Sequence, residues 1–216
     1  MADLPRWPGP QRRIGLTGGI ATGKSSAGRL LEQVHGLPLV DADLLARAAL
    51  APGSAAARTV ADHFGPVVLA PGTGPNEARL DRAALGRIVF GEPTARAWLE
   101  QVVHPIVRHG FEQGLANLVQ KPTVVLVVPL LFEAGLETLC SETWLVDCDD
   151  DQQLARLMAR DGLDEADARS RLTAQWPLAR KRALADVVLD NRGAPGALAP
   201  QVRHALDDVM SMPLPT

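Results

Sequence analysis

A glycine-rich stretch near the amino terminus carries the clearest chemical signal in the chain. Residues 18–25 read Gly-Gly-Ile-Ala-Thr-Gly-Lys-Ser and fit the pattern G-x-x-x-x-G-K-[ST] without a departure. Glycine lets the backbone bend tightly and approach a ligand, so that amide N–H groups can point at phosphate oxygens. Lys24 is the residue type that contacts the β- and γ-phosphates, and the Ser25 hydroxyl is a ligand type for Mg²⁺. The stretch predicts a nucleoside triphosphate site.

The segments on either side are the ones that such a phosphate loop needs. Residues 13–17 are typical of a short buried strand, and residues 25–34 have the apolar spacing of a helix. The amino terminus of that helix would bring unpaired N–H groups and a positive dipole end to the same point. A chance match in a chain with 19 glycines is the alternative, and the strand-loop-helix context argues against it.

Two acidic residues follow the next predicted strand, residues 37–40. Asp41 and Asp43 would lie at the carboxyl edge of the sheet, where open α/β sheets bind their ligands. One of these carboxylates can accept a proton from an attacking hydroxyl, or hold Mg²⁺ through water. The alternative is a cap for the helix that begins near Leu44. For Asp41 both interpretations stay open, whereas for Asp43 we favour a function.

A helical region then separates the second strand from the third. Helices are predicted over residues 44–50, 55–64, 82–90 and 93–121, with an exposed loop near residues 72–75. Within the last of them Pro105 removes an amide donor and would kink the helix, which can turn His104 into a cleft. A lone histidine is more often a structural hydrogen bonder, so this remains the alternative for His104.

The third strand is the most apolar one. Residues 123–128 form a β-branched run of the kind that a central parallel strand requires, and residues 129–133 follow it. The apolar residues after the strand can line an acceptor pocket, and Glu133 can reach the acceptor or Mg²⁺. For Glu133 the alternative is an acid at a helix amino terminus that binds no ligand.

The rest of the chain alternates charged helices with two more strands, at residues 143–147 and 185–190. Charges are dense between residues 156 and 171, which suits either a solvated surface or a lid that brings arginines to the phosphates. Arg156 and Arg160 share one helix face. The turn at Asn191, after the last strand, can contact adenine with backbone groups.

The composition limits the classes of fold and function that the chain can have. A chain of 216 residues and 23.0 kDa suits one α/β domain with room for a helical insertion. The net charge of −3 and a pI near 5.9 argue against nucleic acid as the main partner. Cys140 and Cys148 fit buried thiols better than a metal or disulfide motif. Since neither a signal peptide nor a run of 18 apolar residues is present, we expect a cytoplasmic protein without a membrane partner.

Taken together, these motifs make the chain similar to dephospho-CoA kinase, a P-loop kinase family, over nearly all of residues 12–210. The motifs that carry the resemblance are Ile14–Ile20 leading into Lys24 and Ser25, Asp41–Asp43 followed by Ala46 and Arg47, Val103–Pro105, Val128–Glu133 and Ala185–Asn191. The first motif alone would indicate only a P-loop nucleotide enzyme. The order and spacing of all five are specific.

The resemblance implies an α/β fold of three layers, a five-stranded parallel sheet, a helical acceptor-binding insertion and a lid. It also implies a transferase that uses ATP and Mg²⁺ to phosphorylate the 3′-hydroxyl of dephospho-CoA, giving coenzyme A and ADP. Asp43 would be the base, with Lys24 and Arg156 as the other catalytic residues and Ser25 as the metal ligand. The implied nucleotide-binding residues are Gly19, Ile20, Ala21, Thr22, Gly23, Lys24, Ser25, Ser26, Arg160 and Asn191. Those implied for substrate binding are Thr17, Asp43, His104, Pro129, Leu130, Leu131, Phe132 and Glu133.

The same resemblance divides the chain. Residues 1–11 would be a flexible leader, and residues 12–216 a single kinase domain. The core would comprise about 12–43 and 122–212, the acceptor insertion about 44–121 and the lid about 156–175. Two mild departures concern the phosphate loop: Ala21 stands where the family often has glycine, which could reduce backbone freedom, and Ser26 stands where threonine is common.

Two other functions remain open at this level. A kinase for another small hydroxyl compound would share the loop, the strands and the lid. A nucleotide-gated binding protein would use the phosphate loop as a switch and would not release ADP in response to an acceptor. The acid pair, the apolar strand end and the arginines favour an enzyme. Nothing in the sequence determines the oligomeric state.

Overall fold

A computed structural model describes residues 5–73 and 77–208 of the chain. Contacts divide the chain into two compact units. We call the first, Met1–Val40 with Asn117–Thr216, the sheet unit, and the second, Asp41–Ala116, the helical unit. Each is described by itself.

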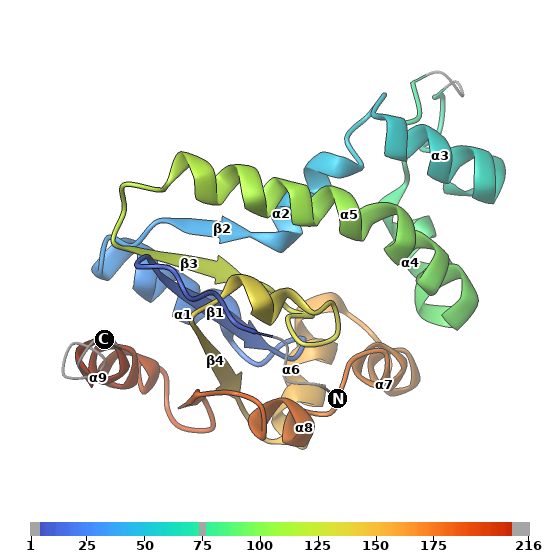
Figure 1. Cartoon of the computed structure of the whole chain (residues 1–216). Helices are drawn as coiled ribbons and strands as arrows, with labels where there is room; N and C mark the ends of the chain where they lie inside the picture. The colour runs from blue at the N-terminus through green and yellow to red at the C-terminus, as the bar shows by residue number, and fades with distance from the viewer. Residues whose placement is uncertain (1–4, 74–76, 209–216) are drawn as a thin grey trace. The chain divides into compact units, whose positions relative to one another are not determined.

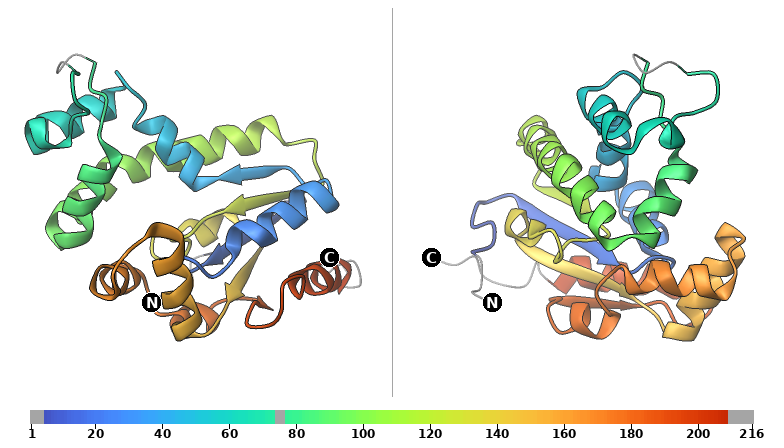
Figure 2. Two further views of the ribbon diagram at one scale, coloured as in Figure 1. Left: turned by 180° about the vertical axis from the view of Figure 1, so that it is seen from behind. Right: turned by 90° about the vertical axis from the view of Figure 1, so that its right-hand side faces the viewer.

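The sheet unit is built on five strands in the order β2-β3-β1-β4-β5 (Figure 1). β1 (Arg12–Gly18) is central, with β3 (Thr123–Val127) on one side and β4 (Glu142–Asp147) on the other; both pair with it in parallel. β5 (Val187–Asp190) pairs in parallel with β4, and β2 (Leu39–Asp41) lies beyond β3. Figure 2 shows the neighbouring strands from two further sides. The predicted five-stranded parallel sheet is confirmed.

Helices cover one face of this sheet. Ile14 and Leu16, alternate residues of β1, are fully buried against Ala27 and Leu31 from the helix that follows the strand. That helix is α1 (Lys24–Arg29), and a π-helical turn over Leu30–Val34 continues it. α9 (Leu198–Asp208) contributes Val202 to the same core. Because strand side chains alternate between faces, β1 supplies this core with every second residue.

The opposite face packs against the segment that follows β3. A Cβ atom on Gly15 would lie 2.7 Å from Sγ of Cys140 and 3.0 Å from Cδ2 of Leu131, so the backbone of β1 and these side chains fit closely. Cys140 and Cys148 are free and buried, as predicted. Burial raises the pKa of the Cys140 thiol to about 12. The short α8 (Leu178–Arg182) also contacts β4.

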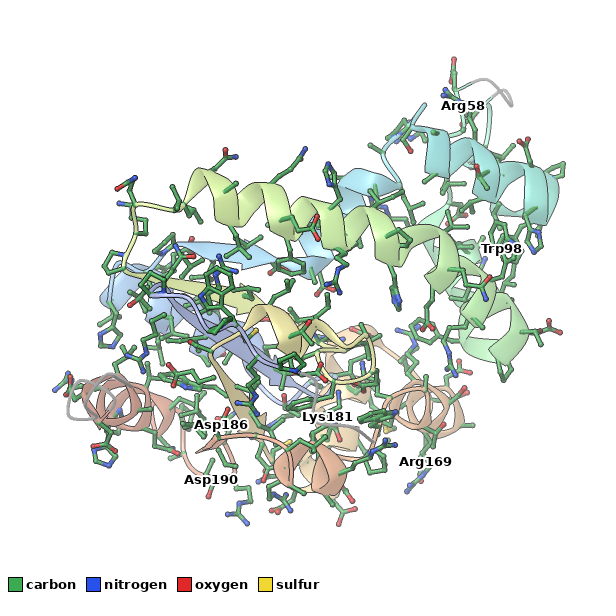
Figure 3. The ribbon with its side chains drawn as sticks, viewed as in Figure 1. Arg58, Trp98, Arg169, Lys181, Asp186 and Asp190 are labelled. Atoms are coloured by element: carbon green, nitrogen blue, oxygen red, sulfur yellow. The ribbon has the colours of Figure 1, made fainter. Side chains whose placement is uncertain are left out.

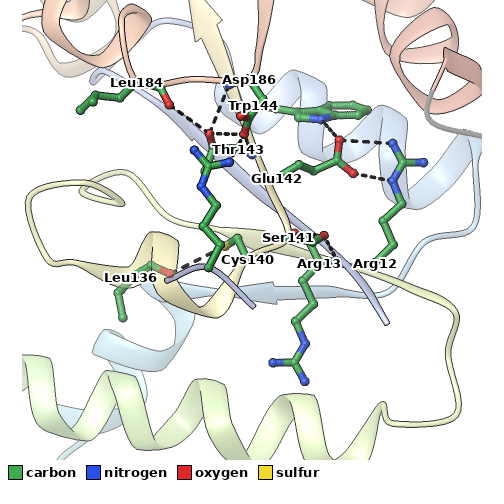
Figure 4. Close-up of polar contacts among 11 residues, drawn as sticks. Arg12, Arg13, Leu136, Cys140, Ser141, Glu142, Thr143, Trp144, Leu184 and Asp186 are labelled. Carbon is green, nitrogen blue, oxygen red and sulfur yellow. Dashed lines mark hydrogen bonds and ion pairs between the residues drawn. The ribbon is translucent and has the colours of Figure 1, made fainter. Parts of the chain in front are cut away.

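Polar side chains join the strands at the start of β4 (Figure 4). Arg12 forms an ion pair with Glu142, whose other oxygen accepts a 2.9 Å hydrogen bond from the Trp144 indole N–H. Asp186 accepts hydrogen bonds from the backbone N–H (2.7 Å) and hydroxyl (2.9 Å) of Thr143. These contacts tie β1 and β5 to β4.

The helical unit contains α2 (Ala42–Ala49), α3 (Ala55–Phe64), a 3₁₀ turn over Gly65–Val68, α4 (Arg82–Gly91) and most of α5 (Pro93–Asn117). Its core gathers Val60, Val68, Leu85 and Val89. Trp98, labelled in Figure 3, packs against this core and stacks on the His63 ring with 3.7 Å between ring centroids. An isolated bridge joins Leu69 to Leu80.

Some predicted boundaries are wrong by a few residues. The helix predicted to end at residue 121 ends at Asn117, because Leu118 and Lys121 form a turn and the residue before Pro122 is disfavoured in a helix. The last strand begins at Val187, not at residue 185, because the Ala185 backbone N–H donates to the Lys181 carbonyl at 3.1 Å and so belongs to the turn after α8. Parts of three predicted segments (residues 1–4, the loop at 74–75 and residues 209–216) lie outside the described residues.

The leader predicted as flexible makes specific contacts from Arg6 onward. The Trp7 backbone N–H donates to the Cys140 carbonyl at 3.0 Å, and Arg6 forms an ion pair with Asp186. Arg13 lies over the Trp7 ring, 3.4 Å from its centroid. This part of the leader is therefore held on the sheet unit, because its one large apolar side chain finds a partner there.

Candidate active site

The phosphate loop leaves the carboxyl end of the central strand and leads directly into α1, as predicted. Gly23 precedes the first helical residue with φ +103°, a conformation that L side chains rarely adopt. Ala21 also has a positive φ, +60°. A non-glycine residue pays about 1–2 kcal/mol for this left-handed conformation. Ala21 therefore holds a backbone conformation that glycine would adopt at lower cost.

The loop is fixed by one hydrogen bond within it and by side chains from three other segments, Asn191, Gln153 and Gln175. The Thr22 hydroxyl donates to the Gly19 carbonyl at 2.9 Å. The carbonyl of Thr22 accepts from Nδ2 of Asn191 at 2.7 Å, and the carbonyl of Ile20 accepts from Nε2 of Gln153 at 2.7 Å. The Ile20 N–H donates to Oε1 of Gln175 at 3.0 Å. These contacts bind the backbone of Ile20 and Thr22 to the rest of the sheet unit.

Two glycines of this loop pack closely against the side chains that support it. A Cβ atom on Gly19 would lie 2.3 Å from Nε2 of Gln153, and one on Gly23 would lie 2.1 Å from Nδ2 of Asn191. Both distances are far below van der Waals contact. The Asn191 side chain supports the phosphate loop, while the backbone contact with adenine that the sequence suggested for its turn remains a prediction.

Lys24 and Ser25 open α1, where backbone N–H groups lack partners within the helix. The Ser25 side chain is exposed, whereas the Ser26 hydroxyl accepts a 3.4 Å hydrogen bond from Arg29. Within the described residues, no group of three or more His, Cys, Asp or Glu side chains is arranged to hold a metal ion. Mg²⁺ usually binds through a few protein oxygens together with substrate phosphates, and the exposed Ser25 hydroxyl fits that mode.

The segment after β3 lies next to the phosphate loop at the same edge, because β3 and β1 are neighbours. The Thr17 hydroxyl donates to the Pro129 carbonyl at 3.3 Å. Leu131 and Phe132 are buried in the protein, with 0% and 6% of their surface exposed, while Leu130 is half-buried. Of the predicted apolar contacts for the acceptor, Pro129 and Leu130 thus retain accessible surface.

Glu133 is engaged by a residue that the sequence analysis missed. Lys181 has no exposed side-chain surface, and its Nζ lies 2.8 Å from Oε1 of Glu133 and donates to the Pro129 carbonyl at 3.0 Å. Figure 3 labels Lys181 within the sheet unit. The same carboxylate oxygen accepts from the Trp176 backbone N–H at 3.0 Å, while Oε2 is buried without a hydrogen-bond partner. Only Oε2 is therefore available for a further interaction.

The two arginines of α6 (Asp150–Asp161) point to different partners. Arg156 donates through Nη2 to the Asn191 carbonyl at 3.0 Å, and its Nη1 is buried without a hydrogen-bond partner. Arg160 instead pairs with Asp161 at 2.7 Å, and this hydrogen bond lowers the pKa of the Asp161 carboxyl. A buried, unpaired guanidinium N–H is a donor that an anionic ligand can satisfy. Arg156 has such a donor.

In the helical unit, Asp41 and Asp43 have different environments, and only the cap role is observed. Asp41 is the N-cap of α2: its Oδ1 accepts from the backbone N–H groups of Asp43 (2.7 Å) and Leu44 (3.4 Å). Asp43 is exposed in the first turn. It borders an open cavity of about 390 Å³, whose other lining residues include Arg47, Arg82, Leu85 and Val89. The cavity joins a carboxylate, cationic side chains and apolar surface.

His104 lies on α5, which continues through Pro105. Its side chain is exposed and does not line the cavity beside Asp43. The buried residues of this part of α5 are its neighbours Val103 and Val107. The role of His104 in acceptor binding remains a prediction.

Comparison with known proteins identifies the family. The dephospho-CoA kinase family model matches residues 12–195. A curated dephospho-CoA kinase from Synechococcus sp. (strain CC9605) is 59% identical over 202 residues, covering 94% of this chain and 95% of that protein. The chain belongs to the dephospho-CoA kinase family. Another curated dephospho-CoA kinase, from Gloeobacter violaceus, is 48% identical over 206 residues, which are 95% of this chain and 96% of that protein.

Solved structures agree with this assignment. The crystal structure of TT1252 from Thermus thermophilus has a TM-score of 0.77 and 35% identity, over 94% of this chain and 100% of that one. A dephospho-CoA kinase from Campylobacter jejuni has a TM-score of 0.65 and 25% identity, over 91% and 96%. The P-loop kinase fold predicted from the sequence is confirmed for this dephospho-CoA kinase family member. Among its described helices, none has the length and apolar character needed to cross a membrane.

Proposed function

We propose that this chain transfers the γ-phosphoryl group of ATP to the 3′-hydroxyl of dephospho-CoA, giving coenzyme A and ADP, the last step of coenzyme A synthesis. The observation that carries the proposal is the family match over residues 12–195, which includes the complete phosphate loop between β1 and α1. We further expect the reaction to take place in the cytoplasm, without a nucleic acid or membrane partner.

The residues of the sheet unit would bind and hold the phosphates. Backbone N–H groups of the phosphate loop, such as those of Ala21 and Gly23, are suited to the phosphate oxygens, and the Lys24 ammonium to the β- and γ-phosphates; the Ile20 N–H is engaged by Gln175. The buried N–H of Arg156 is suited to the charge that develops on the transferred group. Ser25 would be a ligand of Mg²⁺, which neutralises phosphate charge when bound. Arg160 would serve the nucleotide only after leaving Asp161.

The residues of the helical unit would handle the acceptor. Asp43 would orient the 3′-hydroxyl and accept its proton during in-line attack on the γ-phosphorus. Its exposed position beside a cavity with arginines and apolar walls supports this role, since dephospho-CoA combines phosphates with a nucleoside. Thr17, His104 and residues 129–133 remain the other proposed acceptor contacts.

The decisive experiment measures ADP release from Mg-ATP with and without dephospho-CoA, and identifies the product by mass. We expect ADP release to depend on dephospho-CoA, and the product to be heavier by one phosphoryl group. Lys24→Met should abolish this activity. Lys121→Met, which changes an exposed lysine outside the phosphate loop, is the matched control and should keep it.

Other results would redirect the assignment. Acceptor-dependent ADP release that appears only with a different hydroxyl compound would keep the kinase chemistry and reject dephospho-CoA as the substrate. Tight ATP binding without product from any acceptor would indicate a nucleotide-gated binding protein and would contradict the proposal.

A further inference from the structure

Two glutamines hold the peptide groups of a single phosphate-loop residue, Ile20. Gln153, on α6, donates through Nε2 to the Ile20 carbonyl at 2.7 Å. Gln175, in the segment between α7 (Glu165–Thr173) and α8, accepts from the Ile20 N–H through Oε1 at 3.0 Å. We call Gln153 and Gln175 the glutamine pair. Its members come from different elements and engage both backbone polar groups of Ile20.

The carbonyl contact sets the direction of the next amide. A peptide group is planar and trans, so the C=O of one residue and the N–H of the following residue point in opposite directions. Because Gln153 holds the Ile20 carbonyl, the Ala21 N–H points away from Gln153. Asn191 does the same at the Thr22 carbonyl and so directs the Gly23 N–H. Side chains outside the loop thereby fix the orientation of amides within it.

This external support matters because the loop is not in a conformation that its own residues prefer. Ala21 has φ +60°, in the left-handed region that is disfavoured for alanine. Contacts from outside must therefore maintain this backbone. The fit around Gln153 is close: only 7% of its surface is exposed, and a Cβ atom on Gly19 would lie 2.3 Å from its Nε2.

We propose that the glutamine pair positions the phosphate loop for ATP, holding its amides in the orientation that the phosphate oxygens require. This inference rests on the proposed function, because it assumes that the loop binds ATP. Gln153 and Gln175 act through the Ile20 backbone and need no contact of their own with the nucleotide. Preorganised amides bind an anion without first having to reorient, so loss of either glutamine lowers affinity for the phosphates in particular.

The test replaces each glutamine by methionine, which keeps the length of the side chain and removes its amide. For Gln153→Met and Gln175→Met we expect ATP binding, measured by calorimetry, to weaken about tenfold, the effect of losing roughly one backbone hydrogen bond. Adenosine, which lacks phosphates, should bind within about twofold of the wild type in an NMR titration. The KM for dephospho-CoA should likewise stay within about twofold, while the KM for ATP rises.

The matched control is Gln152→Met. Gln152 neighbours Gln153 on α6, and its Nε2 donates to the Arg192 carbonyl at 3.1 Å, outside the phosphate loop. This variant should bind ATP as the wild type does. Should Gln153→Met fail to fold, Gln175→Met carries the test, because Gln175 is less buried than Gln153.

The outcomes separate this inference from the proposed function. Wild-type protein that shows no Lys24-dependent ATP binding would remove the proposed function itself. If the wild type binds ATP and both methionine variants bind it equally well, the positioning role is rejected while the kinase assignment stands. Equal losses for ATP and adenosine, together with a lower melting temperature, would indicate general structural support and would also reject the positioning role.

Discussion

Asp43 is the side chain on which the proposed proton transfer depends. Its first-turn position is secured by Asp41, whose carboxylate caps α2 and accepts from the Asp43 backbone N–H. Asp43→Asn removes the base and keeps the size and the backbone contact of the residue. We expect kcat to fall by about 10²–10⁴-fold, the usual contribution of a general base, with ATP affinity unchanged. Steady-state kinetics and ATP calorimetry measure the two quantities.

A matched control is available in the same unit. Asp62 is exposed on α3 and takes no part in the proposed chemistry. Asp62→Asn should keep the wild-type kcat. Turnover in Asp43→Asn equal to that of the control would exclude Asp43 as the base and would return attention to Glu133.

Ala21 offers a test of backbone strain at the same scale. At φ +60° alanine costs about 1–2 kcal/mol more than glycine in the folded state, while glycine costs roughly 0.5–1 kcal/mol more in lost chain entropy. Ala21→Gly should therefore stabilise the protein by about 0.5–1 kcal/mol. The urea midpoint, followed by circular dichroism, measures the change.

A strained and an unstrained alanine should respond to glycine with opposite signs of the stability change. Ala48→Gly, at an exposed position within α2, provides the contrast and should destabilise by about 1 kcal/mol, since glycine is a poor helix former. If Ala21→Gly destabilised the protein as much as Ala48→Gly, Ala21 would not be strained in solution.

At the scale of elements, α4 depends on its cap. Oδ1 of Asp81 accepts from the N–H groups of Ala83 (2.9 Å) and Ala84 (3.0 Å), which have no partner within the helix. α4 supplies Leu85 and Val89 to the core of the helical unit. We expect Asp81→Ala to lower the free energy of unfolding by about 1 kcal/mol. Chemical denaturation measures it, and a loss no larger than that of Asp62→Ala would show that the cap contributes nothing.

The elements themselves were largely predictable from the sequence. The strand of residues 12–18 and the helix after it follow from an apolar strand pattern joined to a glycine motif, which are local signals. The residues at which these elements end were less predictable. The apolar pattern of α5 continues past Asn117, and the turn that ends it depends on Pro122 and on a contact of Lys121 with Leu118. Such contacts do not appear as a periodic pattern in the sequence.

The supports of the candidate site were not predictable in the same way. Gln153 and Ile20 are 133 residues apart, and a glutamine on a charged helix has no distinguishing local pattern. Gly19 occupies a variable position of the motif, so the motif does not reveal that Gln153 fills the space beside it. Lys181 reads as one cation of a basic helix, yet it is fully buried. These roles depend on which distant segments meet in the fold.

At the scale of the molecule, the phosphate loop shares its sheet edge with segments from three later parts of the sheet unit. Residues after β3, on α6 and after β5 all reach the end of β1, because parallel strands bring their carboxyl ends to one edge. Lys181, on α8, joins that helix to the first of these parts: its Nζ contacts the Glu133 carboxylate and the Pro129 carbonyl. The order of this edge therefore depends on a buried ion pair.

That dependence can be tested by breaking the pair from one side. Lys181→Met leaves the Glu133 carboxylate 15% exposed and without its cation, while its Oε2 already lacks a hydrogen-bond partner. Removing one member of a buried pair is expected to cost about 3–5 kcal/mol, because the remaining charge is uncompensated. The double variant Lys181→Met/Glu133→Gln also removes that charge and should recover a large part of the lost free energy of unfolding. The single Glu133→Gln variant should itself be destabilised. Urea denaturation of the four proteins gives the coupling energy. A coupling energy near zero would mean that the two side chains do not act as a pair, and the edge would then owe its order to the hydrogen bonds of the loop alone.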